Sequence, residues 1–262
     1  MVKKRVTALV TSTDSKSKRW RSLAAAARMA YETGEFRQAE SLLARALELA
    51  KDLSEKSIAV SATEIGRAAV LLATRRYREA VSQLEKTMAA LQSFSDDAHK
   101  ELLAVAARFY AQVLIEQGDE RQAEKELLGS ISILEEIGTD AAVQLCYTLS
   151  DLAGLYVRQG RISEAEKYIS SSMDILHSID DIDDAEFTRA TMIYKLCEPQ
   201  SPEDMLEQAS AGIIQMQYQY GAKHPNMARA LNNFFKVLSE RGDRSRIEEI
   251  EKRFGVVFSG KQ

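Results

Sequence analysis

The sequence predicts an all-α protein, an α-solenoid of about six antiparallel helix pairs with a C-terminal capping helix. The first observation is a motif of nearly constant spacing that is marked by Ala39, Ala80, Ala123 and Ala165. A period of about 42 residues is typical of stacked supersecondary units. The second observation is that apolar residues fall at helical spacing, whereas the sequence lacks alternating strand patterns bounded by turn residues.

Each repeat consists of two predicted helices separated by a short turn. In the first repeat the turn is at Gly34, because glycine adopts left-handed backbone angles without steric cost. Small and apolar residues line one face of each flanking helix: Leu23, Ala26, Ala27 and Ala30, then Ala39, Leu42, Leu43, Ala46 and Leu47. The corresponding turns of the next repeats fall at Arg75, Gly118 and Gly160.

The four repeats also share a register of small residues. The first helix carries one at Ala27, Ala68, Ala111 and Ala153, and the second helix carries a late one at Ala46, Thr87, Ser130 and Ser172. This pattern resembles the tetratricopeptide repeat, in which small side chains let paired helices approach closely. One extra methylene in such a contact costs about 1 kcal/mol or more. The resemblance implies a right-handed superhelix whose first helices line the concave face.

Two further repeats are degenerate. Met205 and Ile247 continue the alanine series at nearly the same spacing, so the period persists where the motif fades. Phe235 replaces the small residue of the first helix, and we expect the last pair to splay or repack around it. The final helix carries the charges that a terminal repeat needs as a cap, namely Glu248, Glu249, Glu251, Lys252 and Arg253.

The last repeat has a second resemblance. Its residues 221–242 are similar to the long-period repeats of kinesin light chains, which carry the same order of Gly221, His224, Pro225, Ala228, Leu231, Asn232, Asn233 and Gly242. This resemblance covers one repeat well and the others loosely. It implies the kinesin light chain-like subclass and groove asparagines that bond the backbone of a bound peptide.

We predict three segments: a basic, partly flexible N-terminal arm (1–20), the solenoid (21–254) and a C-terminal tail (255–262). The stretch 1–22 contains seven lysines and arginines and one acidic residue, Asp14, although the whole chain has a net charge of −4. A basic arm can contact an acidic protein, nucleic acid or an anionic membrane. The alternatives are a solvated N-terminus and, from its Ser/Thr content, an organelle transit peptide.

The sequence lacks recognisable catalytic, metal and cofactor motifs, so we expect a non-enzymatic protein with no cofactor. Residues 255–262 match the start of a phosphate-binding loop, but Gln262 replaces the hydroxyl residue that holds magnesium. The two cysteines and three histidines show no ligand spacing. The acidic run 180–186 is typical of a helix start, where carboxylates complement the helix dipole. Without an apolar stretch of about 20 residues or a secretory core, a cytoplasmic protein is expected.

The candidate site is the concave groove that the resemblance implies. Its positions place arginines and aromatic residues around an apolar floor that includes Ile65 and Leu72. Such a groove suits an extended or helical peptide with hydrophobic anchors and an acidic group. The alternative for Ile65 and Leu72 is packing against the neighbouring repeat. The predicted protein- or peptide-binding residues are Arg28, Tyr31, Arg108, Phe109, Gln112, Tyr147, Tyr194, Arg229, Asn232, Asn233 and Lys236.

The sequence therefore favours an adaptor that holds one or more proteins or peptides in this groove. Two alternatives stay open: a protein associated with a tubulin-like cytoskeletal filament, and a peptide-sensing regulator whose curvature responds to a short ligand. The resemblance also disfavours chaperone C-termini as partners, because Ala24, Arg28 and Gly66 stand where chaperone-binding members of the tetratricopeptide-repeat family carry a carboxylate clamp of lysines and asparagines. Aromatic residues of the last repeat, such as Phe234 and Phe258, indicate a homo-oligomer contact.

Overall fold

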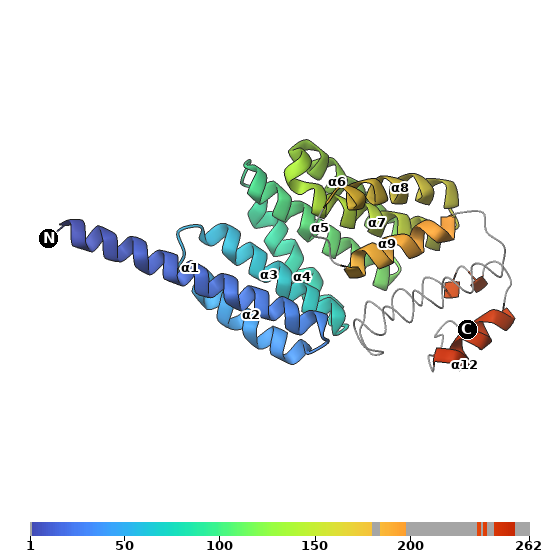
Figure 1. Cartoon of the computed structure of the whole chain (residues 1–262), viewed down its shortest axis with the longest axis horizontal. Coiled ribbons are helices and arrows are strands. Elements are labelled where there is room, and N and C mark those ends of the chain that lie inside the picture. Colours follow the sequence, from blue (N-terminus) through green and yellow to red (C-terminus); the bar gives the residue numbers. More distant parts are fainter. Residues whose placement is uncertain (1, 180–183, 198–234, 237, 240–243, 255–262) are drawn as a thin grey trace. The chain divides into compact units, whose positions relative to one another are not determined.

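The computed structural model describes residues 2–179, 184–197, 235–236, 238–239 and 244–254, which are almost entirely helical, and within 2–179 successive helices are joined by short turns (Figure 1). They contain no strand, which confirms the all-α prediction. The chain divides into two compact units, Met1–Asp119 and Glu120–Gln262. The elements are α1 (Val2–Glu32), α2 (Phe36–Ala50), α3 (Lys56–Ala73), α4 (Tyr77–Leu91), α5 (Asp97–Gln117), α6 (Glu120–Ile137), the 3-10 turn η1 (Gly138–Ala141), α7 (Ala142–Arg158), α8 (Ile162–Ser178), α9 (Asp184–Cys197) and α12 (Arg244–Phe254).

The first helix of each of the four repeats ends in the same left-handed turn. Backbone φ is 78° at Gly34, 60° at Arg75, 86° at Gly118 and 73° at Gly160. The amide after each of these residues donates to the carbonyl five positions earlier, as Arg76 does to Leu71 at 2.8 Å. This is the Schellman arrangement, which satisfies carbonyls that a helix end leaves free. The turns thus fall where the repeat motif predicts them.

The alanines that define the period are fully buried. Ala39, Ala80, Ala123 and Ala165 are each 0% exposed. The small residues of the first helices are 0% to 3% exposed as well, and those late in the second helices are 0% to 7% exposed. Helices α1 and α2, α3 and α4, and α7 and α8 pack as pairs. Burial at all three positions confirms that small side chains mark the helix contacts.

An arginine after the turn bridges to the preceding repeat in each unit. In the first unit, Arg76 lies 2.9 Å from Glu40 on α2. In the second, Arg161 lies 2.9 Å from Glu124 on α6. Each arginine also pairs with a glutamate three positions later in its own chain segment. The two glutamates Glu40 and Glu124 directly follow the buried alanines of the period, so the same bridge is built twice from matching positions.

Helix α1 is continuous through the boundary predicted at residue 21. Trp20 packs against the buried residues Leu53 and Ala59, and its indole N–H donates to Thr63 Oγ1 at 3.0 Å. These contacts attach the middle of α1 to α3. The role of the preceding basic residues stays a prediction.

The described end of the chain also contains the capping helix expected there. Helix α12 buries Ile247, whereas Glu248 and Lys252 are exposed. Phe235, the bulky residue of the last repeat, is 1% exposed, so the interior of the second unit accommodates its ring. Cys146 and Cys197 are free and buried.

Candidate functional site

In the first unit, the predicted groove is best defined at Arg108 and Phe109. Both lie on α5 and both are half-buried. The guanidinium carbon of Arg108 lies 4.7 Å from the centre of the Phe109 ring, within the range of a cation–π contact. Phe109 also packs against the core around Ile65 and Leu72. The pair therefore combines a held positive charge with partly exposed aromatic surface.

The other predicted groove residues of the first unit differ in burial: some belong to the core and others are exposed to solvent. Ile65 and Leu72, predicted as the groove floor, are each 4% exposed and belong to the core. Gln112 is 8% exposed. Tyr31 is half-buried and packs its ring edge against that of Phe36, with 5.8 Å between centres. Arg28 is exposed and pairs only loosely, at 3.5 Å, with Glu32 one turn away.

In the second unit, the described groove residues lie on α7, on α9 and in the last repeat. Tyr147 on α7 and Tyr194 on α9 are half-buried. Lys236 lies 3.9 Å from Glu120, a glutamate that also pairs with Arg158. The remaining predicted binding residues, Arg229, Asn232 and Asn233, lie outside the described residues.

A largely buried ion-pair cluster joins α7 to α9, and the sequence reasoning missed it. Arg189 on α9 lies 2.6 Å from Asp151 and 2.7 Å from Glu186. Its guanidinium also donates to the Tyr147 carbonyl at 3.3 Å. Burial disfavours the charged guanidinium, but Glu186 and Asp151 outweigh that effect and raise the pKa of Arg189. Arg189 follows Tyr147 by 42 residues, which is one period of the repeat. A search for residue pairs at this separation could have predicted the contact between α7 and α9.

A second cluster that the sequence reasoning missed joins the first turns of α3 and α5. The Nε2 atom of His99 lies 2.9 Å from Ser57 Oγ, and its Nδ1 atom lies 2.7 Å from Asp96 Oδ2. The hydrogen bond from His99 lowers the pKa of Asp96. Hydroxyl, imidazole and carboxylate follow one another as in a nucleophile relay. However, Asp96 also caps α5 by accepting the His99 amide, and the Phe94 ring stacks on the imidazole at 3.9 Å, so we assign the cluster a structural role.

The described residues meet the requirements of neither a metal site nor a membrane-spanning helix. They contain no group of three or more histidine, cysteine or acidic side chains placed to hold a metal ion. None of the described helices combines the length and the apolar character needed to cross a membrane.

Comparison with known proteins identifies the fold. No protein family model and no curated protein matches the chain. Among solved structures it is similar to aspartyl phosphate phosphatase F from Bacillus subtilis, with a TM-score of 0.72 and 13% identity over 91% of this chain and 59% of that one. It is also similar to a Rap protein complexed with competence and sporulation factor, with a TM-score of 0.65 and 14% identity over 92% of this chain and 66% of that one. These are proteins of tetratricopeptide-like repeats. The chain has a tetratricopeptide-repeat fold.

The tetratricopeptide-repeat assignment confirms the solenoid that the period predicts. At these identities the likeness shows the fold alone, and the chain spans only 59% and 66% of the length of the two structures named. The structure of BtubC (BKLC) from P. vanneervenii is similar as well, with a TM-score of 0.52 and 14% identity over 84% of this chain and 89% of that one. The kinesin light chain-like subclass is one of several that share the fold, and its signature segment 221–242 lies mostly outside the described residues, so that assignment stays a prediction.

Proposed function

We propose that this tetratricopeptide-repeat protein is a non-enzymatic adaptor that holds a segment of a partner protein against the first helices of its repeats. The observation that carries the proposal is the pair formed by Arg108 and Phe109 on α5. A guanidinium held 4.7 Å from a half-buried ring presents both an anchor for an apolar side chain and a charge for a carboxylate. Arginine and aromatic residues are the types that most often dominate binding energy at protein interfaces.

The proposal also draws on the similar solved structures. One of them is a Rap protein complexed with competence and sporulation factor, so a chain of this fold holds such a factor in that case. In the present chain, the predicted binding residues Arg28 and Tyr31 of the first unit are partly or fully exposed, and Tyr147 and Tyr194 of the second unit are partly exposed. The partner segment expected from these residues has apolar anchors and at least one acidic group.

Peptides selected from a random display library against the full chain test this proposal. Their affinities would be measured by fluorescence anisotropy on the wild type, on Phe109→Ala and on Arg108→Gln. We expect Phe109→Ala to weaken binding about tenfold, which corresponds to roughly 1.4 kcal/mol. Arg108→Gln should weaken only peptides that contain an acidic residue.

The control is Arg45→Glu, because Arg45 is an exposed cation on α2, away from α5. Circular dichroism would confirm that every variant is as helical as the wild type. Selected peptides that bind Phe109→Ala and Arg108→Gln as tightly as the wild type would show that the groove is not the binding site.

A second candidate function is a ligand-sensing regulator. It is favoured by the likeness to aspartyl phosphate phosphatase F and to the Rap complex, whose TM-scores exceed that of BtubC. In this version a bound peptide changes the curvature of the repeats. Small-angle scattering with and without a selected peptide distinguishes the two: a regulator changes its radius of gyration on binding, whereas a rigid adaptor keeps it.

A further inference from the structure

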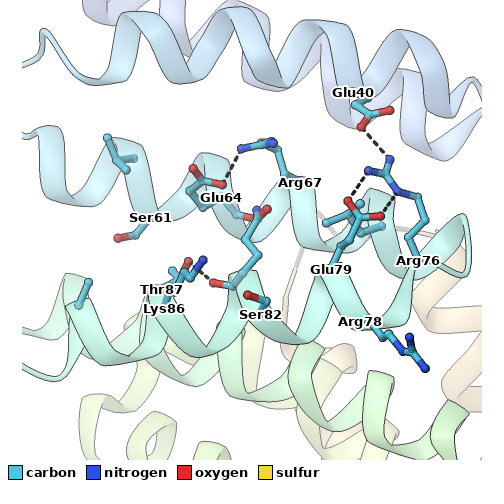
Figure 2. Close-up of a pocket in the computed structure, with 14 residues that line it drawn as sticks. Glu40, Ser61, Glu64, Arg67, Arg76, Arg78, Glu79, Ser82, Lys86 and Thr87 are labelled. Atoms are coloured by element: carbon cyan, nitrogen blue, oxygen red, sulfur yellow. Dashed lines mark hydrogen bonds and ion pairs between the residues drawn. The ribbon is translucent and has the colours of Figure 1, made fainter.

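The first unit contains an open cleft that is separate from the predicted groove. It lies between α2, α3 and α4 and has a volume of about 590 Å³ (Figure 2). From α3 it is lined by Glu64, Arg67 and Leu71, which are spaced by three and four residues and therefore share one face of the helix. The groove residues Arg108 and Phe109 do not line it. The cleft thus offers a second surface on the same unit.

The carboxylates that line the cleft already have cationic partners. Glu64 lies 3.0 Å from Arg67. Arg76 lies 2.9 Å from Glu40 and 2.7 Å from Glu79. Figure 2 shows Arg76 reaching from the turn before α4 toward Glu40 on α2, beside Glu79. Because each acidic group is paired, none of the three is left to neutralise another cation.

Helix α4 adds three side chains with donors that pair with no described residue: Arg78, Ser82 and Lys86. They are spaced by four residues, so they follow one face of the helix. Eight residues of α-helix rise about 12 Å, which sets the approximate separation of the two cations along the helix axis. In Figure 2, Arg78 extends from α4 away from α3, at the end of the cleft near Arg76. These three side chains therefore offer two positive charges and one neutral hydroxyl donor to a ligand in the cleft.

The matching place in the second unit is filled. The offset that relates Arg76 to Arg161, two repeats later, also relates Leu71 and Gln83 to Tyr156 and Tyr168. Tyr156 is 3% exposed, and its ring centre lies 5.6 Å from that of Tyr168. By the same offset, Glu64 and Arg67 correspond to the buried residues Leu149 and Leu152. Two tyrosines and two leucines thus occupy what is an open, charged cleft in the first unit, so the cleft is not a necessary product of the repeat.

We propose that the cleft between α2, α3 and α4 binds an acidic peptide segment of a partner protein, laid along α4 with carboxylates at Lys86 and Arg78. An extended chain advances about 3.3 Å per residue, so acidic residues four positions apart match a cation separation of roughly 12 Å. Three carboxylates neutralise most of the positive charge that lines the cleft, so the excess positive charge is too small to favour a dense polyanion such as nucleic acid or an anionic bilayer. A peptide with two spaced acidic groups and apolar or small residues between them fits this mixed charge.

The probe is a fluorescein-labelled nine-residue peptide with two glutamates four positions apart, and its matched control carries glutamine at both places. Binding to the full chain would be followed by anisotropy at low ionic strength. We expect saturable binding of the glutamate peptide that weakens with added salt. Lys86→Glu should weaken it at least about fivefold by reversing an attractive charge. Arg45→Glu is the control, because Arg45 holds the corresponding position on α2 and lies outside the cleft.

A second variant closes the cleft without changing its charge. The double substitution Leu71→Tyr and Gln83→Tyr copies the two tyrosines of the second unit and should abolish peptide binding. Phe109→Ala should leave it unchanged, which separates this site from the groove. Equal losses in Lys86→Glu and Arg45→Glu, no saturable binding of the glutamate peptide, or tighter binding of single-stranded DNA or phosphatidylserine vesicles that Lys86→Glu abolishes would each overturn the proposal.

Discussion

Arg75 holds the backbone position that Gly118 holds one repeat later. Their φ angles are 60° and 86°, and among the described residues Arg75 is the only non-glycine with a positive φ. A left-handed conformation costs an L-residue roughly 1 to 2 kcal/mol, because its Cβ crowds the following carbonyl. The second repeat therefore stores backbone strain at the turn where the other three repeats use glycine.

Replacing Arg75 with glycine should relieve this strain. Glycine loses more conformational freedom on folding, at roughly 0.5 to 1 kcal/mol, so the expected net stabilisation is about 0.5 kcal/mol. Urea denaturation would measure the free energy of unfolding. Arg75→Ala keeps the Cβ and should give no gain. A glycine variant less stable than the wild type would show that the arginine side chain contributes more than its backbone costs.

The turns and the alanine register could be predicted because they depend on local chemistry. A left-handed turn favours glycine because other residues are strained there, and a close helix contact requires a small side chain. Both therefore recur in the sequence as particular residue types at a fixed spacing. The prediction at Ala123, for example, needed no knowledge of its neighbours. Burial of all four alanines follows directly from that repeat.

The site residues were harder to predict, because exposure depends on helix rotation and on partners in other repeats. Ile65 and Leu72 were placed at the groove floor by counting positions, yet neighbouring helices cover both. Arg189 lies in a repeat where the alanine motif is no longer recognisable. No sequence motif therefore predicts its ion pair with Asp151. A comparison of residues one period apart would have paired Ser57 with His99, since they are 42 positions apart.

The contact between Ser57 and His99 should contribute to stability. Ser57→Ala removes the hydroxyl 2.9 Å from a ring nitrogen of a histidine that is largely buried. Loss of one such hydrogen bond costs about 1 kcal/mol. Hydrogen exchange should rise at the starts of α3 and α5, which the contact joins. Ser93→Ala is the control, because Ser93 is exposed and bonds only within its own turn; an equal effect of the two variants would remove any special role for the cluster.

The same cluster predicts a loss of stability in acid. The hydrogen bond from His99 lowers the pKa of Asp96 below its ordinary value of 3.8. A carboxylate with a lowered folded pKa stabilises the fold above the unfolded pKa and loses that contribution as pH falls through the folded value. The wild type should therefore lose more stability than Asp96→Asn below about pH 3.8, since asparagine still caps a helix but does not titrate. Urea midpoints that fall in parallel for both proteins would contradict this linkage.

Loss of the ion pair between Arg189 and Asp151 should lower the free energy of unfolding strongly, because it is a largely buried pair among the described residues of the second unit. Arg189→Ala removes the guanidinium that lies 2.6 Å from Asp151, whose side chain is 5% exposed. Breaking a buried pair by removing one partner costs roughly 3 to 5 kcal/mol, and we expect about 3 because Arg189 is itself 24% exposed. Arg121→Ala, which removes an exposed cation from α6, should change the free energy of unfolding by less than about 0.5 kcal/mol.

The double variant Arg189→Ala with Asp151→Asn decides whether charge or packing is responsible. If the buried charge of Asp151 causes the loss, neutralising that carboxylate should recover at least half of the stability lost by Arg189→Ala, since the charge that Arg189 balanced is then gone. Glu186 pairs with the same guanidinium and keeps an exposed fraction of 11%, so recovery should stay incomplete until it too is replaced by glutamine. A double variant as unstable as the sum of its single changes would show that Arg189 acts by packing between α7 and α9.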